Sequence, residues 1–223
     1  MFEDRADAGA RLAEKLSEYR ASASSAGSQR HSASTPALVL GIPRGGVAVA
    51  AEVARDLGLS LDVVVATKVG APGNPEFAVG AVAADGEVHT NPSTALPADE
   101  VRRISGPAHA KAVHEVSLFR AERGPLNLED RTVIVVDDGL ATGLTALAAV
   151  GYVRRMGAER VVLAVPVAPP DTVGRIAGYV DELVVLESPE EFSAVGRFYR
   201  RFGQVEDAEV LTLLARAAQR TIG

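Results

Sequence analysis

Short apolar runs alternate with segments of helical periodicity through the middle of the chain. Six runs predict strands, at residues 38–42, 61–66, 77–83, 132–136, 161–165 and 180–186. Three segments predict helices, at residues 47–57, 98–123 (interrupted near Gly106) and 142–156. The run at 132–136 is β-branched throughout, as expected for a strand covered on both faces. The alternation indicates βαβ units, so we predict an α/β fold with a mainly parallel twisted sheet and flanking helices.

The two ends of the chain differ from this alternating middle. Residues 3–19 place apolar side chains at helical spacing and predict an amphipathic helix. Residues 21–36 are a Ser/Ala-rich stretch that can bury little apolar area, so we expect a flexible linker. A last helix is predicted at residues 211–218. The chain has no internal repeat and no clear boundary between two domains, so residues 1–223 are predicted to form a single domain.

The strongest chemical signal is the segment VIVVDDGLATGLT at residues 133–145. Asp137 and Asp138 end a buried strand, at the edge where open parallel sheets bind ligands. The turn and helix start that follow offer N–H groups, hydroxyls and the helix dipole to a phosphate. The residues concerned are Gly139, Ala141, Thr142, Gly143, Leu144 and Thr145. The alternative is a plain turn with a helix cap, but two adjacent acids at the end of a buried strand are costly without partners.

A second glycine-rich turn, GIPRGG at residues 41–46, follows the first predicted strand. Gly45 and Gly46 allow the main chain to approach an oxyanion, and Arg44 adds a fixed charge with bidentate geometry. Lys68 lies beyond the second strand and can reach an anion as a point charge. The alternatives are glycines that only permit the turn and a lysine that is only solvated. Glu76 follows in a Gly/Pro-rich loop; it could bind metal or substrate, but a turn carboxylate is the preferred interpretation.

Composition limits the class of protein further. The chain has no cysteine, which excludes disulfides, thiolate metal sites and a cysteine nucleophile. Its net charge of −6 disfavours a nucleic-acid partner but allows a small basic pocket. No apolar run approaches ~18 residues and no signal-peptide pattern is present, so we expect a cytoplasmic protein with no membrane partner. His109 and His114 are five residues apart and miss the spacing of a helical zinc pair.

The segment VIVVDDGLATGLT resembles the signature by which type I phosphoribosyltransferases bind 5-phosphoribosyl-1-pyrophosphate (PRPP). The resemblance extends more weakly from about residue 37 to the C-terminus, and is closest to an uncharacterised branch with segments such as GIPRGGVAVA and FAVGAV. It implies that Asp137 and Asp138 contact the ribose hydroxyls. It also implies that residues 141–145 hold the 5′-phosphate.

The same resemblance implies the roles of the remaining candidate residues. The GIPRGG turn is similar to the pyrophosphate loop of the family, so Gly45, Gly46 and Arg44 would contact pyrophosphate, with Lys68 beside them. Mg²⁺ is the expected cofactor. It would be held mainly through the substrate, with the acids at 137 and 138 contributing at most through water.

Two further regions have counterparts in the family. Residues 87–123 lie where the family has a loop that closes over the active site; their first part, to residue 97, looks irregular and the rest helical. The basic residues of this region are Arg102, Arg103, Lys111, Arg120 and Arg123, most of which are expected on a solvated face. Residues 166–223 are expected to form a small hood and the C-terminal helix. Their aromatic residues, Phe192, Phe198, Tyr199 and Phe202, are expected in the core, with stacking on a nucleobase as the alternative.

The resemblance implies a Mg²⁺-dependent enzyme that transfers the phosphoribosyl group of PRPP to a nucleobase-like acceptor and releases pyrophosphate. Purines, pyrimidines, nicotinate-like rings and amines stay open as acceptors, and a homodimer is compatible with the family. The alternative is a non-catalytic regulator that binds PRPP or a nucleotide on the same scaffold. A receiver-type signalling domain is disfavoured because Lys68 precedes Asp137. The P-loop, dinucleotide-binding and serine-hydrolase motifs are absent.

Overall fold

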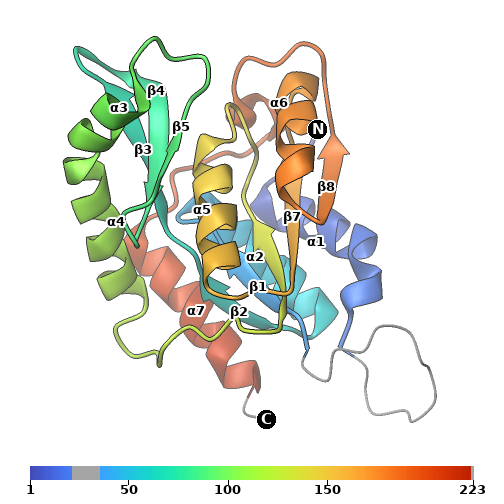
Figure 1. The fold of residues 1–223 in the computed structure, drawn as a ribbon. Coiled ribbons are helices and arrows are strands. Elements are labelled where there is room, and N and C mark those ends of the chain that lie inside the picture. Colours follow the sequence, from blue (N-terminus) through green and yellow to red (C-terminus); the bar gives the residue numbers. More distant parts are fainter. Residues whose placement is uncertain (22–35, 222–223) are drawn as a thin grey trace.

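A five-stranded parallel sheet forms the centre of the molecule (Figure 1). A computed structural model describes residues 1–21 and 36–221, so the predicted linker lies outside the described residues except for its two end residues. The strand order is β2-β1-β6-β7-β8. The bounds are β1 Leu38–Gly41, β2 Ser60–Val63, β6 Thr132–Val136, β7 Arg160–Val167 and β8 Glu182–Glu187. The predicted mainly parallel α/β fold is therefore confirmed.

A separate antiparallel sheet, in the order β3-β4-β5, lies beside the main one. Its strands are β3 Ala66–Ala71, β4 Asn74–Ala83 and β5 Val88–Thr90. The predicted strand at 61–66 is wrong in extent, because the apolar run leaves the main sheet after Val63 and enters the small sheet at Ala66. The predicted irregular stretch at 87–97 contains β5, which is short and only partly buried and has little apolar pattern.

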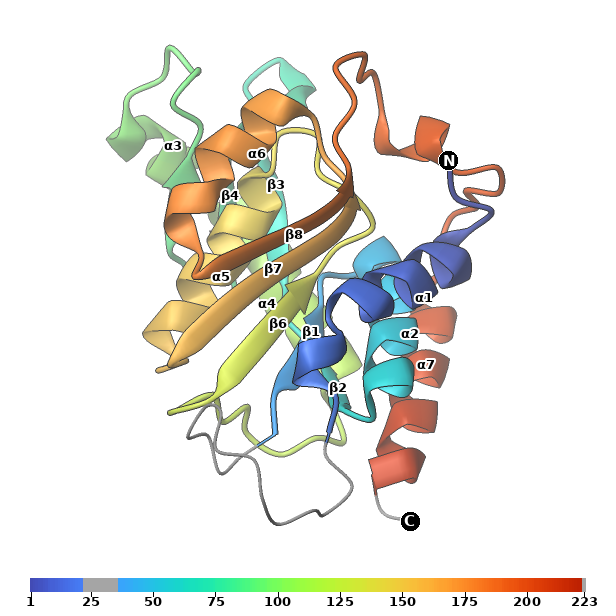
Figure 2. The same ribbon diagram turned by 90° about the vertical axis from the view of Figure 1, so that its right-hand side faces the viewer.

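Helices cover both faces of the main sheet (Figure 2). One face carries α1 Arg5–Lys15, α2 Gly45–Leu57 and α7 Asp207–Thr221. The other carries α5 Leu144–Arg155, α6 Pro170–Ile176 and the small sheet, which is flanked by α3 Ala98–Ile104 and α4 Gly106–Phe119. Three short 3₁₀ turns complete the described elements: η1 Ser17–Tyr19, η2 Ala177–Tyr179 and η3 Val195–Phe198. No helix in the described ranges is long and apolar enough to cross a membrane.

The alternation of side chains along the strands divides the core in two. In β6, Ile134 faces the cluster with α1, α2 and α7, whereas Val133 and Val135 face the cluster with α5. All three are fully buried. A strand buried on both faces requires a continuous apolar run, which is why this strand was predictable to the residue.

Several helices depart from the sequence pattern. Helix α5 starts at Leu144 rather than residue 142, because Gly143 has a φ of 68° and ends the turn. The C-terminal helix starts at Asp207 rather than residue 211. Helix α6 was not predicted; it is only seven residues long and starts at Pro170, where proline is tolerated because the first turn needs no N–H donor.

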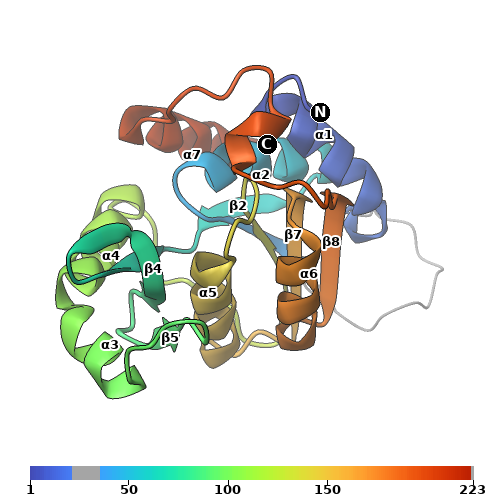
Figure 3. The ribbon, with the colours of Figure 1, turned by 90° about the horizontal axis from the view of Figure 1, so that it is seen from above.

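The N-terminal residues lie against the segment between β8 and α7 (Figure 3). Phe2 pairs with Tyr199 in a parallel bridge; its N–H donates to Phe198 O at 2.7 Å, and its carbonyl accepts from Arg200 N at 2.9 Å. The rings of Phe2 and Tyr199 pack with their centroids 5.4 Å apart. The N-terminal residues and the segment that precedes α7 therefore meet at one place.

Candidate functional site

The two predicted ligand-binding turns meet at the carboxyl ends of β1 and β6. These strands are neighbours, and Ile42 N donates to Val136 O at 2.9 Å. A Cβ on Gly46 would lie 2.7 Å from Val136 O, and a Cβ on Gly45 would lie 2.6 Å from Asp138 Cγ. Both positions therefore require glycine. The first turn, which also has a cis peptide bond between Pro43 and Arg44, lies directly against the acid pair.

The acids Asp137 and Asp138 form a compact, poorly hydrated pair. Asp138 N donates to Asp137 Oδ1 at 2.8 Å. Burial, and then the charge of Asp138, raise the pKa of Asp137 well above its ordinary value. Burial also raises the pKa of Asp138, although Arg5 opposes that shift. Within the described residues, Oδ2 of Asp137 and Oδ1 of Asp138 accept no hydrogen bond, so each carboxylate keeps an oxygen for a ligand.

Arg5 is the direct partner of Asp138 and was not among the predicted site residues. Its Nε donates to Asp138 Oδ2 at 2.8 Å, and its Nη1 donates to Gly203 O at 2.8 Å. The guanidinium lies over the Phe202 ring, 3.9 Å from the centroid. No sequence signal could have found this contact, because Arg5 stands in an amphipathic helix separated from the rest by the Ser/Ala stretch.

Residues of β7 and α6 hold the predicted phosphate loop, residues 139–145, in place by hydrogen bonds. Leu140 N donates to Val167 O at 2.9 Å, and Thr172 Oγ1 donates to Ala141 O at 2.7 Å. Arg175 Nη2 donates to Thr142 O at 2.6 Å. The contacts of Thr172 and Arg175 occupy the carbonyl groups of Ala141 and Thr142 and leave the N–H groups of residues 141–145 free. Thr172 and Arg175 were not predicted, because α6 is short and has no clear sequence pattern.

The N–H groups of this loop point to no protein acceptor. In the part of the chain that the structure describes, no hydrogen bond leaves the main-chain nitrogens of Ala141, Thr142, Gly143, Leu144 or Thr145. A Cβ on Gly143 would overlap Ile176, and its positive φ also favours glycine. The start of α5 is thus a set of free donors at the positive end of a helix, which suits an anion.

The start of α2 has the same property. The main-chain nitrogens of Gly45 and Gly46 donate no hydrogen bond to a described residue. Two helix starts with free N–H groups therefore flank the carboxylates of Asp137 and Asp138. This arrangement places two anion sites on either side of a pair of hydrogen-bond acceptors.

The cationic candidates Arg44 and Lys68 are engaged elsewhere. Arg44 Nε donates to Asp207 at the start of α7, and its Nη2 lies 3.8 Å from Glu115 in α4. These carboxylates, Asp207 first, raise the pKa of the guanidinium. Lys68 Nζ lies 3.4 Å from Glu76 Oε2, beside a pocket of about 500 Å³ between β3, β4 and α4. Among the described residues, neither cation contacts the acid pair.

The remaining candidates divide into structural and site-facing groups. Arg120 and Arg123 pair with buried Asp62, at 3.1 and 3.5 Å, so they are not on the solvated face expected for most of their region. The hydroxyl group of Tyr199, from the aromatic cluster, donates to Asp138 O at 2.6 Å, so this residue reaches the site.

Across the described ranges, no group of three or more His, Cys, Asp or Glu side chains could hold a metal ion by itself.

Comparisons with known proteins agree with this geometry. The family model for the phosphoribosyl transferase domain matches residues 5–199. Two curated proteins from Mycobacterium tuberculosis strains, named provisionally as phosphoribosyl transferases, are each 42% identical over 97% of this chain. The match covers 47% of those proteins, so the chain spans about half their length. The crystal structure of TT1426 from Thermus thermophilus is 41% identical, with a TM-score of 0.77 over 97% of this chain and 98% of that one. The chain therefore belongs to the phosphoribosyl transferase domain family, as the resemblance at residues 133–145 implied.

Proposed function

We propose that this protein transfers the 5-phosphoribosyl group of PRPP to a nucleobase-like acceptor and releases pyrophosphate. The observation that supports this most is the pair of helix starts with free N–H groups on either side of two carboxylates. PRPP has the complementary pattern, with an anion at each end of a sugar that carries two adjacent hydroxyls. The match involves three separate elements of the fold, which is why it favours PRPP over a simple phosphate ligand.

The proposed binding mode assigns one part of PRPP to each element. The 5′-phosphate accepts hydrogen bonds from the N–H groups at residues 141–145. The ribose hydroxyls donate to the free oxygens of Asp137 and Asp138. The pyrophosphate accepts from the N–H groups of Gly45 and Gly46 at the start of α2. Each contact uses a protein N–H donor or carboxylate acceptor that has no protein partner in the described part of the chain.

The residues of the chain would act in the reaction by position and charge. The bond between ribose C1 and pyrophosphate breaks, with its electron pair leaving on the pyrophosphate, as a lone pair of the acceptor forms a bond to the opposite side of C1; the proton that the acceptor then gives up passes to solvent. Asp137 and Asp138 lie close to the positive charge that develops on the ribose. The donors at Gly45 and Gly46 receive the negative charge of the leaving group. Fixed dipoles in a poorly hydrated site need little reorganisation, so electrostatic preorganisation supplies much of the rate.

Mg²⁺ fits this site only together with the substrate. The described residues provide two neighbouring carboxylates but no cluster of three or more metal-binding side chains. Mg²⁺ commonly binds through one or two carboxylates plus substrate phosphates and water, which is the set available here. When bound, the ion would neutralise part of the charge on the pyrophosphate.

The test is calorimetric binding of PRPP with and without Mg²⁺, followed by a screen of acceptors for pyrophosphate release. The variants are Asp138→Asn, Asp137→Asn and, as a matched control, Asp99→Asn at an exposed position in α3. We expect Mg²⁺-dependent binding by the wild type and the control, and loss of most activity in Asp138→Asn with the fold retained. A wild type that binds PRPP but releases no pyrophosphate with any acceptor would instead support the regulator. Unchanged turnover in Asp138→Asn would contradict the site.

A further inference from the structure

Arg5 brings the N-terminal helix into the centre of the site. Its Nε and Asp138 Oδ2 are 2.8 Å apart, and the two side chains are 13% and 16% exposed. A Cβ added to Gly45 would lie 3.0 Å from Arg5 Nε. The guanidinium therefore touches both the second acid and the turn proposed for pyrophosphate.

The position of this cation contrasts with that of Arg44. Arg44 belongs to the pyrophosphate turn by sequence, yet its guanidinium contacts Asp207 and Glu115 and is 36% exposed. Arg5 is remote in sequence, yet it is more buried and contacts Asp138 directly. Within the described residues, Arg5 is thus the cation that compensates the acid pair.

The contact determines which oxygen of Asp138 faces a ligand. Arg5 occupies Oδ2, and in the described ranges Oδ1 has no partner. The main chain of Asp138 is held separately, by Tyr199 Oη at the carbonyl oxygen and by Asp137 Oδ1 at the nitrogen. With both main-chain groups fixed, Arg5 is what sets the rotation of the side chain.

We propose that Arg5 is a positioning residue for the reaction: it orients Asp138 so that its free oxygen accepts a ribose hydroxyl of PRPP. This inference rests on the proposed function. Arg5 itself does not touch the ribose in this role but acts through the carboxylate. The site is then completed by a helix that lies N-terminal to the whole sheet.

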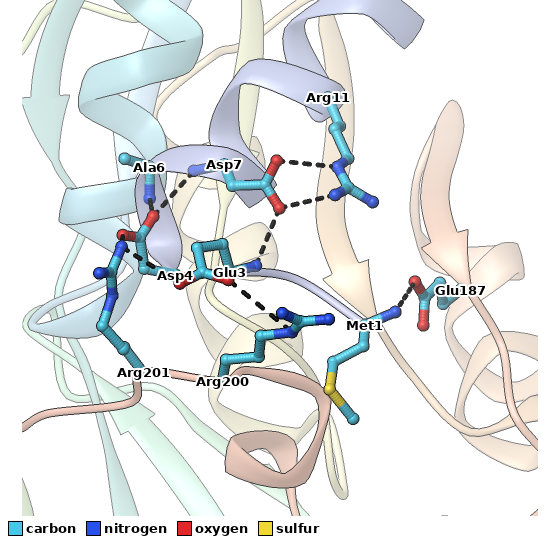
Figure 4. A network of polar contacts seen from close by, with 9 residues as sticks. All are labelled: Met1, Glu3, Asp4, Ala6, Asp7, Arg11, Glu187, Arg200 and Arg201. Carbon is cyan, nitrogen blue, oxygen red and sulfur yellow. Dashed lines mark hydrogen bonds and ion pairs between the residues drawn. The ribbon is translucent and has the colours of Figure 1, made fainter.

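In a merely structural role, Arg5 would only hold α1 against the segment before α7, through its contacts with Gly203 O and Phe202. Other contacts already join these segments, as Figure 4 shows. Arg201 Nη2 donates to Asp4 Oδ2 at 2.8 Å and lies 3.5 Å from Glu3 Oε1. Arg201 is 68% exposed and makes no described contact with the acid pair, so it is a matched control for a residue that only holds these segments together.

The experiment compares Arg5→Met, Arg5→Lys and Arg201→Met with the wild type by calorimetry. The two ligands are PRPP with Mg²⁺ and ribose 5-phosphate, which has the hydroxyls but no pyrophosphate. Urea unfolding checks that each variant is folded. Should Arg5→Met fail to fold, Arg5→Lys gives the comparison, because lysine keeps the charge but cannot contact Asp138 and Gly203 O together in fork geometry.

We expect Arg5→Met to weaken the binding of both ligands by about tenfold to a hundredfold, the usual effect of losing a hydrogen bond to a charged group, because the misplaced Asp138 carboxylate no longer accepts the ribose hydroxyl. Arg5→Lys should bind both ligands less tightly than the wild type but more tightly than Arg5→Met. Arg201→Met should stay within about twofold of the wild type.

Three results would overturn the inference while leaving the proposed function intact. They are wild-type affinity in both Arg5 variants, an equal loss in Arg201→Met, or a loss for PRPP without a loss for ribose 5-phosphate. The last result would mean that Arg5 serves the pyrophosphate directly. A folded wild type that binds neither ligand would overturn the proposed function and this inference together.

Discussion

Replacing Gly45 by alanine tests whether the pyrophosphate turn and the acid pair are in contact. Gly45 is the first residue of α2, and a Cβ there would lie 2.6 Å from Asp138 Cγ. Gly106 is the first residue of α4, and a Cβ there would meet nothing within 4 Å. The two substitutions are chemically identical and occupy the same position in a helix. They differ only in what the new methyl group meets.

The expected difference follows from these distances. Both changes reduce the freedom of the unfolded chain, which contributes about 0.4–1 kcal/mol of stability when the folded state accepts the methyl group. At Gly45, non-bonded carbons prefer a separation of about 3.5–4.0 Å, so the Asp138 carboxylate must retreat by about 1 Å. That movement breaks the hydrogen bond from Arg5, which is worth about 1.5–3 kcal/mol between charged groups. Gly45→Ala should therefore be less stable than Gly106→Ala by about 2 kcal/mol.

Urea unfolding and calorimetry with PRPP and Mg²⁺ measure the two consequences. Gly106→Ala should be at least as stable as the wild type and bind PRPP normally. Gly45→Ala should lose stability and bind PRPP about tenfold more weakly or worse, because the carboxylate no longer faces the ribose. If Gly45→Ala matched Gly106→Ala in both measurements, the close approach of Gly45 to Asp138 would be refuted.

Three further substitutions probe the surroundings of the acids. Burial, and then the charge of Asp138, raise the pKa of Asp137 above its ordinary 3.8, so its ionisation costs stability as pH rises. Asp137→Asn should therefore increase the free energy of unfolding near neutral pH and lose this advantage below pH 3.8, which urea unfolding across pH would show. Tyr199→Phe removes the 2.6 Å hydrogen bond to the Asp138 carbonyl and should cost about 1 kcal/mol of stability in the same assay; no change would argue against that bond. Thr172→Val removes the 2.7 Å contact with Ala141 O and should weaken PRPP binding about threefold to tenfold by calorimetry, and full affinity would mean that the loop needs no support from α6.

The parts of the molecule that could be predicted are those whose structural constraint leaves a recognisable residue pattern in the sequence. The strand at 132–136 is apolar throughout because both of its faces are buried, and Asp137 and Asp138 follow at its carboxyl end. Glycines mark the two turns because a methyl group at Gly46 would approach the main chain of a neighbouring strand and one at Gly143 would meet a positive φ and Ile176. In each case the constraint leaves a recognisable residue type in the sequence, even where the partner, such as Val136 for Gly46 or Ile176 for Gly143, belongs to another element.

The parts that could not be predicted depend on contacts between distant residues. Arg44 looked like the cation of the site, but Asp207 and Glu115, from two other helices, engage it. Arg5 looked like an ordinary polar residue of a surface helix, and only the fold brings it to Asp138. No local pattern encodes such pairs, so their roles could not be inferred before the fold was known.

The pairing of Phe2 with Tyr199 bears on the order in which the molecule is completed during synthesis. The strands and helices that carry both turns emerge from the ribosome before Tyr199 and Gly203. Domains begin to form as the chain is made, so β1, β6 and β7 can associate while Phe2 still lacks Tyr199 and Arg5 still lacks Gly203. The contacts of Phe2 with Tyr199 and of Arg5 with Gly203 form afterwards. Until then, the segment of Tyr199 and Gly203 does not cover Asp137 and Asp138 in the nascent chain.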